Sequence, residues 1–429
     1  MEKISKKNST ALTIFLCWLA YTVAYLGRYS YSSSILLIEK FYNVSHAQAG
    51  TVTTMFFFAY GIGQVVHGIL SKYYDKRLIV SLALIISSII NILVFIGVPF
   101  AIIKYLWLVN GICQSVLWPT LISVLSKNIP TEKIRTAMLA MSSTVALGTA
   151  IIYGLSSVFS LITNGFFYVF LIASILMILV AVVWFILYNK ATDNSVIVES
   201  KQNEVIIQTE ESGVVKPKKQ VEKAVLFVVV ILGLFAVVDN LVKDGLNTWT
   251  PSILKETFAL PESLSIILSL VLPILGMGGT LFVTYLAKKI KSFISLAGLI
   301  FLMAFGVIGL IIIFLSPTFA GVNLMWIIPI ILLGIVSLLM HAANSVITSM
   351  APLYMRDKMD SGLLAGVLNG SCYVGSTISS YGLGVIADNS GWNAVFYLLF
   401  GLCLIPAIIA FVISVVNIIK SKKNKSIAN

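Results

Sequence analysis

Two basic residues stand inside long apolar stretches of this sequence. Arg28 lies near the middle of the run from about residue 11 to residue 38, and Lys243 lies at a similar depth in the run that begins near residue 223. An unpaired arginine at the centre of a membrane costs about 2.5–3.5 kcal/mol on insertion scales. A water-filled cavity and an anionic ligand would offset that cost, because guanidinium is a planar fork of donors that fits phosphate or carboxylate. No Asp or Glu lies at mid-membrane depth in the first six runs to pair with Arg28.

Lys243, in contrast, has acidic neighbours. Asp239 lies four residues before it, a spacing that puts both side chains on one helix face, and Asp244 follows it directly. We expect Asp239 to hold Lys243 in the empty protein and to be displaced or protonated when a ligand binds; simple neutralisation of a structural lysine is the alternative. His341, in a later apolar run, could relay protons or bind the ligand, or it could be a packing residue.

The elements that must position these charges are membrane-spanning helices. Of the 429 residues, 59% are hydrophobic and only 11% are charged, and the mean hydropathy is +0.99. A span needs about 20 mainly apolar residues, and runs of this length exclude the alternating pattern of membrane strands. Twelve runs qualify. They begin near Ala11, Gln48, Leu78, Ala101, Thr136, Gly165, Lys223, Glu262, Ser292, Asn323, Ser361 and Trp392. The sequence therefore predicts an all-α membrane protein with twelve transmembrane helices.

The charged residues outside these runs predict the topology and the division of the chain. Lysines and arginines concentrate in alternate loops and at both ends, which predicts that both termini are cytoplasmic. A polar stretch with balanced charges separates the first six runs from the last six. We expect a six-helix half over 1–189, a cytoplasmic linker over 190–222 and a second six-helix half over 223–429. Two such halves would place Arg28 and Lys243 on opposite walls of one midplane cavity.

Five segments carry a resemblance to a known family. They are YTVAYLGRYSYSSS in the first run, FFFAYGIGQVVHGILS in the second, NGICQSVLWPT in the fourth, NLVKDGLNTWTPSILKE in the seventh and GVLNGSCYVGS in the eleventh. With these segments the chain resembles the major facilitator superfamily over nearly its whole length. Within the superfamily it is similar to the organophosphate:phosphate antiporters, which include the glycerol-3-phosphate and hexose-phosphate transporters.

The resemblance implies roles for individual residues. It implies that Arg28 and Lys243 are the paired cations that bind the substrate. Substrate contacts are implied for Tyr25, Tyr60, Tyr373 and Tyr21, whose hydroxyls could donate to phosphate, although tyrosines also gather at membrane interfaces for other reasons. Gln64 stands where the family commonly has a lysine, and it completes the expected binding set.

These observations lead to one main functional hypothesis and two alternatives. We expect a secondary transporter that exchanges an organophosphate for inorganic phosphate by alternating access. Asp239 beside Lys243 keeps open a proton-coupled symporter of a carboxylate or zwitterion, and a non-transporting sugar-phosphate sensor is a third reading. The sequence holds no nucleotide-binding motif, metal-ligand spacing or catalytic set, so we expect no enzyme activity, no cofactor, no metal and no nucleic acid partner. We expect a monomer in the cell (inner) membrane whose partners are lipid and a small anionic solute.

Overall fold

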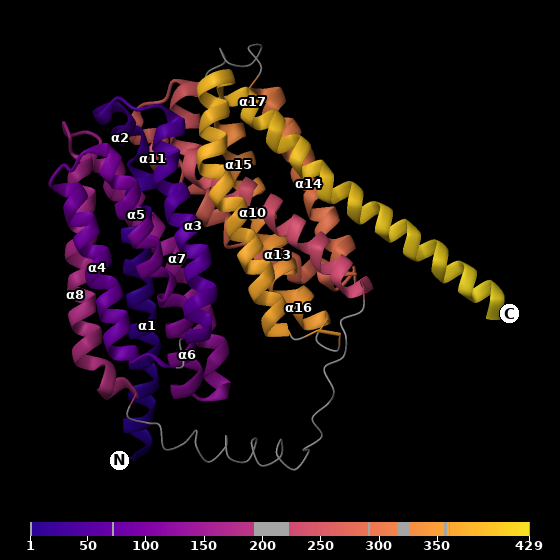
Figure 1. The fold of residues 1–429 in the computed structure, drawn as a ribbon, viewed down its shortest axis with the longest axis horizontal. Coiled ribbons are helices and arrows are strands. Elements are labelled where there is room, and N and C mark those ends of the chain that lie inside the picture. Colours follow the sequence, from indigo (N-terminus) through magenta and orange to yellow (C-terminus); the bar gives the residue numbers. More distant parts are fainter. Residues whose placement is uncertain are drawn as a thin grey trace.

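The described part of the chain is helical. The computed structural model describes residues 2–70, 73–192, 223–290, 292–315, 326–355, 358–359 and 361–428, and it contains no strand within these ranges. The predicted linker therefore lies outside the described residues from residue 193 onward. Helices that precede this gap form one group and helices that follow it form a second group, and the two groups stand side by side (Figure 1). We call them the N-group and the C-group.

The N-group contains eight helices. Their bounds are α1 Glu2–Ser33, α2 Ile35–Tyr42, α3 His46–Leu70, α4 Lys76–Phe95, α5 Phe100–Ser115, α6 Leu117–Asn128, α7 Thr131–Phe159 and α8 Phe166–Thr192. Their ends follow local signals. The Asp75 carboxylate caps α4 by accepting from the backbone of Arg77 and Leu78, and Asn43 ends α2 in the left-handed conformation, at φ 50°.

The C-group is more broken. Its elements are α10 Lys223–Phe258, α11 Glu262–Leu268, α12 Val271–Gly276, α13 Gly279–Ala287, α14 Phe293–Phe314, α15 Ile327–Ser345, the π-helix η3 Val346–Met350, α16 Ala351–Tyr354 and α17 Ser361–Ala428. The run expected to begin near Glu262 is thus divided into α11, α12 and α13, in a segment that holds Pro273 and the glycine pair Gly278 and Gly279. Proline removes a helix donor and glycine weakens helix continuity, so this segment bends beside the centre of the molecule.

The helices are long and apolar enough to cross a membrane repeatedly. Eleven helical stretches of the described residues meet the length and hydropathy of a span, and the last, Leu364–Val416, has 53 residues. At 1.5 Å per residue this is about 80 Å, more than twice a bilayer core of about 30 Å. Gly391 interrupts α17 with φ 74° and ψ 173°, and the chain reverses there (Figure 1). The stretch is therefore long enough to cross a membrane twice, as expected from the two apolar runs that begin near Ser361 and Trp392.

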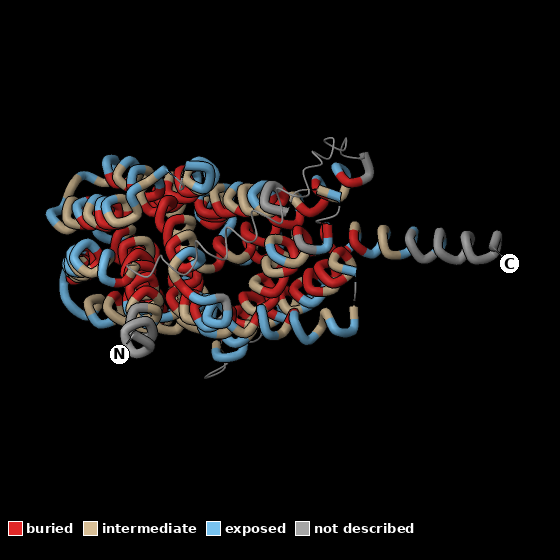
Figure 2. The backbone as a smooth tube through the Cα atoms, turned by 90° about the horizontal axis from the view of Figure 1, so that it is seen from below, coloured by how far each residue is buried: buried red, intermediate tan, exposed pale blue. Residues whose placement is uncertain are grey.

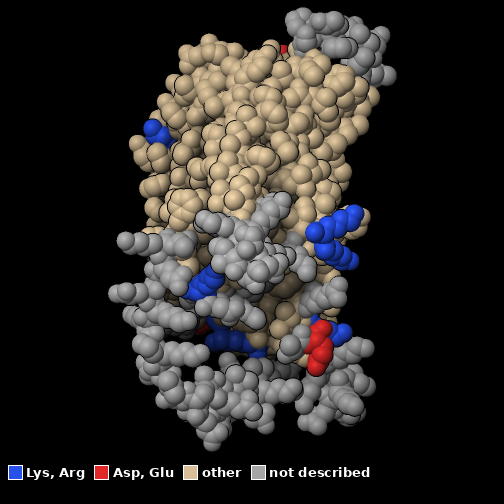
Figure 3. Space-filling model, turned by 90° about the vertical axis from the view of Figure 1, so that its right-hand side faces the viewer, with Lys and Arg blue, Asp and Glu red and all other residues tan. Residues whose placement is uncertain are grey.

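Burial follows the membrane pattern rather than the soluble one. Buried residues face neighbouring helices, while exposed residues lie around the outer rim (Figure 2). Many of the exposed side chains are large and apolar, among them Phe227 at 63%, Ile186 at 63% and Phe411 at 69% exposed. One face of the molecule shows a broad uncharged surface, with most of its coloured Lys, Arg, Asp and Glu atoms toward one end (Figure 3). Such a belt suits contact with lipid.

Hydrogen bonds between the two groups gather at the end where α2 and α11 lie, which is opposite the N-terminus (Figure 1). We call it the α2 end. Asp388 of α17 accepts from the backbone N–H groups of His46, at 3.0 Å, and Ala47, at 2.8 Å, which are the first two residues of α3. The His46 ring lies between Glu39 of its own group, at 2.9 Å, and Glu256 of the C-group, at 3.2 Å.

Trp392 completes this set by donating its Nε1–H to Glu256 at 2.8 Å. We refer to Glu39, His46, Glu256, Asp388 and Trp392 as the α2-end clamp. A second bridge lies beside it, where Glu262 accepts from Lys40 of the N-group at 3.0 Å and from Lys255 at 2.8 Å. The clamp therefore holds the two groups together at the α2 end.

Three glycines allow close contacts beside the clamp, where α3 meets α17. A Cβ atom added to Gly50 would lie 2.3 Å from the carbonyl oxygen of Ser380, and one added to Gly384 would lie 2.7 Å from the carbonyl oxygen of His46. Farther along, a Cβ on Gly61 would lie 2.6 Å from Cβ of Tyr373. Only glycine permits such an approach of two backbones. We call these three contacts the glycine seam.

Candidate ligand-binding site

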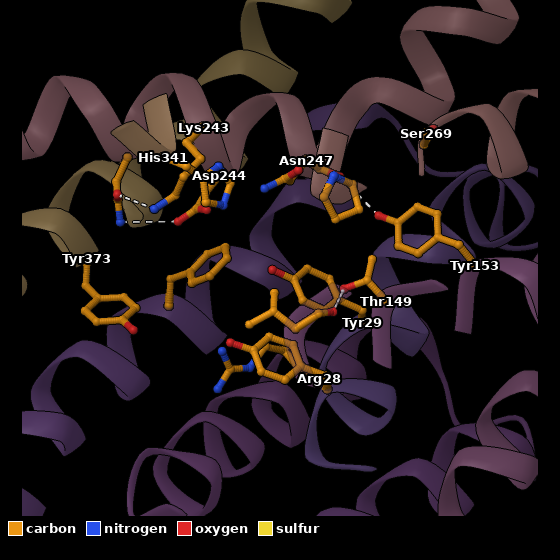
Figure 4. Close-up of a pocket in the computed structure, with 15 residues that line it drawn as sticks. Arg28, Tyr29, Thr149, Tyr153, Lys243, Asp244, Asn247, Ser269, His341 and Tyr373 are labelled. Carbon is orange, nitrogen blue, oxygen red and sulfur yellow. Dashed lines mark hydrogen bonds between the residues drawn. The ribbon is translucent and has the colours of Figure 1, made fainter. Parts of the chain in front are cut away.

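A cavity of about 180 Å³ lies between the two groups. Its lining comes from both, so neither group forms it alone. The lining residues are Tyr25, Arg28, Tyr29, Phe57, Val145, Thr149, Tyr153, Asn240, Lys243, Asp244, Asn247, Ser269, Pro273, His341 and Tyr373. Figure 4 shows Arg28 on one wall and Lys243, with Asp244, Asn247 and His341, on the facing wall. The two cations singled out from the sequence are thus brought to one cavity, from opposite sides.

Arg28 is fixed by polar and aromatic contacts. Its Nε donates to Oε1 of Gln114 at 3.3 Å, and its guanidinium carbon lies 4.2 Å from the ring centroid of Tyr60 and 4.8 Å from that of Tyr25. Contacts of a guanidinium with aromatic faces contribute about 0.5–2 kcal/mol each. Among the described residues no carboxylate lies within ion-pairing distance of this arginine. Arg28 is therefore oriented, half-buried and without an acidic partner, as an anion ligand requires.

The other predicted contacts of the N-group lie around Arg28 but differ in access. Tyr25 lines the cavity, whereas Tyr21 is buried behind it, with its ring 5.1 Å from that of Tyr25 and 5.0 Å from that of Trp118. Tyr60 stacks on the guanidinium without lining the cavity.

Two further predicted residues connect the groups. Gln64 donates its Nε2–H to the Tyr60 hydroxyl at 2.9 Å and accepts from Asn369 of α17 at 3.1 Å. This geometry makes Gln64 a link between α3 and α17 outside the cavity lining, where sequence reasoning expected a substrate contact. Tyr373 of α17 does line the cavity, and its ring centroid lies 5.0 Å from that of Tyr60.

Lys243 does not pair with Asp239, and here the structure corrects the expectation. Its Nζ donates to Oδ1 of Asn240 at 2.7 Å. Asp239 instead accepts, through Oδ2, from Nδ2 of Asn344 at 3.0 Å, and it does not line the cavity. Asp239 is fully buried, and its Oδ1 has no hydrogen-bond partner among the described residues. The physical reason is that Asn240, one turn before Lys243, offers a nearer oxygen on the face that borders the cavity.

Asp244 belongs to the cavity wall, although the sequence analysis gave it no role. Its Oδ2 accepts from the Ser376 hydroxyl of α17 and from Nδ2 of Asn240, the latter at 3.4 Å. A signal was present: Asn240, Lys243, Asp244 and Asn247 stand at i, i+3, i+4 and i+7, a polar stripe along one face of an apolar helix. All four line the cavity, and Asp239 falls outside the stripe.

His341 of α15 also lines the cavity. Its Nδ1 lies 2.9 Å from the carbonyl oxygen of Ser337, a contact that requires the proton on Nδ1 and leaves Nε2 as the acceptor of the neutral ring. A Cβ on Gly276 of α12 would lie 2.8 Å from two atoms of the ring, so the absence of a side chain there makes room for it. His341 is therefore held where α12 meets α15, with one nitrogen left for other contacts.

Comparisons with known proteins agree with this architecture. The sequence pattern of the Major Facilitator Superfamily matches residues 17–359. Sugar phosphate exchanger 3 of Homo sapiens is 24% identical over 383 residues, which are 81% of this chain and 76% of that protein. The membrane sensor protein UhpC of Escherichia coli (strain K12) is 30% identical over 97 residues, which are 23% of this chain and 22% of the sensor. The chain thus matches less than a quarter of that sensor's length.

Solved structures give the same fold. A bacterial homolog of the human lysosomal transporter Spinster, inward-facing and occupied, matches with a TM-score of 0.71 at 15% identity, over 94% of this chain and 96% of that one. The D-xylose-proton symporter matches with a TM-score of 0.66 at 13% identity, over 93% and 95%. At these identities the likeness shows the fold alone. The family pattern, the spanning helices and the two-walled cavity together identify the chain as a multi-pass membrane transporter, not an enzyme, that belongs to the Major Facilitator Superfamily.

Proposed function

We propose that this transporter exchanges a small organophosphate for inorganic phosphate by alternating access. The observation that carries the proposal is Arg28, an oriented guanidinium without a carboxylate partner, facing Lys243 across a cavity shared by the two groups. A phosphate group accepts bidentately from guanidinium, and a ligand that contacts both walls favours the arrangement in which they are close. The name of one relative, sugar phosphate exchanger 3, supports this class of ligand.

Counterflow of labelled phosphate tests the proposal. Purified protein in liposomes preloaded with unlabelled phosphate should accumulate labelled phosphate transiently, and external glycerol 3-phosphate should compete. Arg28→Gln should abolish the exchange, because the amide has no charge and no donor fork. Glu132→Gln is the control, since Glu132 is an exposed carboxylate in the first turn of α7. Binding without exchange would indicate the sensor role instead, and exchange that survives Arg28→Gln would refute the assignment of the site.

A proton-coupled symporter is the second candidate, and Asp239 favours it. A fully buried carboxylate with one oxygen lacking a donor is costly when ionised, and a bound proton would remove that charge. In this reading a proton on Asp239 accompanies a carboxylate or zwitterion through the same cavity. Uptake that requires a pH gradient, and that loses this requirement in Asp239→Asn, would select the symporter over the exchanger.

We also propose the orientation expected from the charge distribution, with the chain in the cell membrane and both termini cytoplasmic. The α2 end then faces outward, and the α2-end clamp closes the outer side of the cavity. Labelling of Phe41→Cys, which replaces an exposed residue of α2, by an impermeant thiol reagent in intact cells tests this. Labelling only after the cells are opened would contradict the orientation.

A further inference from the structure

The cavity is not lined by cations alone, because Asp244 presents a carboxylate to it. Both hydrogen bonds that Asp244 accepts reach Oδ2. Oδ1 accepts none from the described residues, and it is not among the unpartnered atoms sealed from solvent, as Oδ1 of Asp239 is. Since Asp244 lines the cavity, this second oxygen is available to a ligand there.

Among the described residues no cation forms an ion pair or a hydrogen bond with this carboxylate. Lys243, the next residue, points its ammonium at Asn240, and within the described part of the chain no ion pair includes Asp244. A largely buried carboxylate without a cationic partner raises the free energy of the folded protein unless donors complete its hydrogen bonds. An ammonium group on the ligand would supply them through charge-assisted bonds, which are about twice as strong as those of a neutral hydroxyl.

The charge of the lining leads to the same class of ligand. The charged lining residues are Arg28, Lys243 and Asp244, which leave a net charge of +1 with His341 counted as neutral. A phosphate monoester carries about −1.5 to −2 near pH 7, more than these walls balance. One ammonium on its organic part brings the ligand close to −1 and gives Asp244 its partner.

The size of the cavity limits the ligand to a small molecule. Its volume of about 180 Å³ is below the roughly 300–1,000 Å³ of sites that take drug-sized ligands. The two ends of the ligand are set by the walls, because Arg28 faces the wall that carries Asp244 (Figure 4). A short linear molecule with phosphate at one end and ammonium at the other matches this placement of opposite charges on the two walls.

We propose that the organic substrate is a short aminoalkyl phosphate, with its phosphate on Arg28 and its ammonium on Asp244 and the neighbouring Asn247. The proposal rests on the proposed transport of organophosphates and names the class within it. Asp244 then selects against dianions that lack an amine.

Three probes that share a phosphate group test the selection: inorganic phosphate, glycerol 3-phosphate and phosphoethanolamine. Their affinities for the purified full chain are measured by titration calorimetry at pH 7. We expect phosphoethanolamine to bind about tenfold more tightly than glycerol 3-phosphate, as a charged in place of a neutral hydrogen bond implies. Phosphocholine, whose quaternary ammonium has no N–H donor, should lose this advantage.

Asp244→Asn should cancel the preference, with weaker binding of phosphoethanolamine and tighter binding of the two other probes. Glu132→Gln, which removes a carboxylate outside the cavity, should leave all affinities unchanged. The inference would be overturned by equal affinities of the wild type for glycerol 3-phosphate and phosphoethanolamine, or by an equal loss of affinity for all three probes in Asp244→Asn. Either result would leave the proposed function standing. Absence of binding by every probe would overturn both. If Asp244→Asn does not fold, the wild-type ratio decides.

Discussion

Removal of one charge from the α2-end clamp should open that end of the transporter. Asp388→Asn is the most direct change, because its carboxylate accepts at 3.0 Å and 2.8 Å from the first two backbone N–H groups of α3. These donors have no partner inside their own helix, and they carry the positive end of the helix dipole. Asparagine keeps one acceptor oxygen, but it loses the charge and turns an N–H group toward the second donor.

The size of the effect follows from these contacts. A hydrogen bond to a charged group contributes about 1.5–3 kcal/mol. Asp388 is exposed, so solvent and salt reduce the contribution of its hydrogen bonds to the lower end of that range. We expect a loss of about 1.5 kcal/mol, which shifts the equilibrium between closed and open α2 ends roughly tenfold.

Distances between spin labels measure that equilibrium. Phe41→Cys in α2 and Ser390→Cys in α17 place labels on exposed positions of the two groups at the α2 end. The native cysteine Cys113, which is only partly buried, is replaced by serine first. The long-distance population should rise about tenfold in Asp388→Asn and remain unchanged in Glu132→Gln. An unchanged distribution in both would refute the reasoning and show that contacts other than this carboxylate keep the α2 end closed.

Three further changes test the clamp, the cavity and the glycine seam. Burial raises the pKa of Glu39, and its hydrogen bond with His46 offsets only part of the rise. Because the pKa of this carboxyl is higher in the closed clamp, closing of the clamp binds a proton. Lowering the pH from 7 toward the solvated pKa of about 4.3 should therefore favour the closed form. Because the pKa values of His46 and Glu256 are also shifted in the clamp, the measurement is the difference between the pH profiles of wild type and Glu39→Gln. Identical pH profiles would contradict this role of Glu39. Arg28→Lys keeps the charge but loses the donor fork, and should weaken phosphate binding roughly tenfold or more in calorimetry; affinities within twofold would argue against bidentate binding. Gly50→Ala places a methyl group against the backbone of α17 and should open the α2 end in the label measurement, whereas an unchanged distance would mean that the helices adjust.

Local composition predicted the spans well and their interruptions poorly. Apolar runs of about 20 residues have few alternatives to spanning helices, and the helices described by the structure begin near the expected residues. The breaks between α11, α12 and α13 were not predicted, because proline and glycine occur within many membrane helices and only packing decides which of them bend. Gly276 illustrates this, since its role depends on the ring of His341, which is 65 residues away in sequence.

The candidate site was predicted in part. Arg28, Lys243, Tyr25, Tyr373 and His341 line the cavity, since a charge or hydroxyl in an apolar run is visible from sequence. Tyr21, Tyr60, Gln64 and Asp239 lie behind or beside it, because one step along a helix turns a side chain by about 100° and membership of a run does not fix its direction.

The α2-end clamp was missed altogether for a different reason. Its contacts join residues as far apart as His46 and Asp388, 342 positions along the chain. No periodicity in one segment indicates such a pair, since each partner alone is an ordinary polar residue at a helix end.

The glycine seam has a mechanical consequence. Where α3 meets α17 at Gly50 and Gly384, the two backbones approach closely, and the side chain that bridges them nearby is small: the Thr54 hydroxyl donates to the carbonyl oxygen of Thr377 and accepts from the backbone N–H of Tyr381. Separation of the two helices at the glycines would require no bulky side chain to leave a socket on the partner helix, although it would break the two hydrogen bonds of Thr54. The resistance to motion then comes mainly from polar contacts, in the α2-end clamp and along α3 at Thr54 and Gln64, and those contacts can be adjusted by mutation without disturbing the helices that they join.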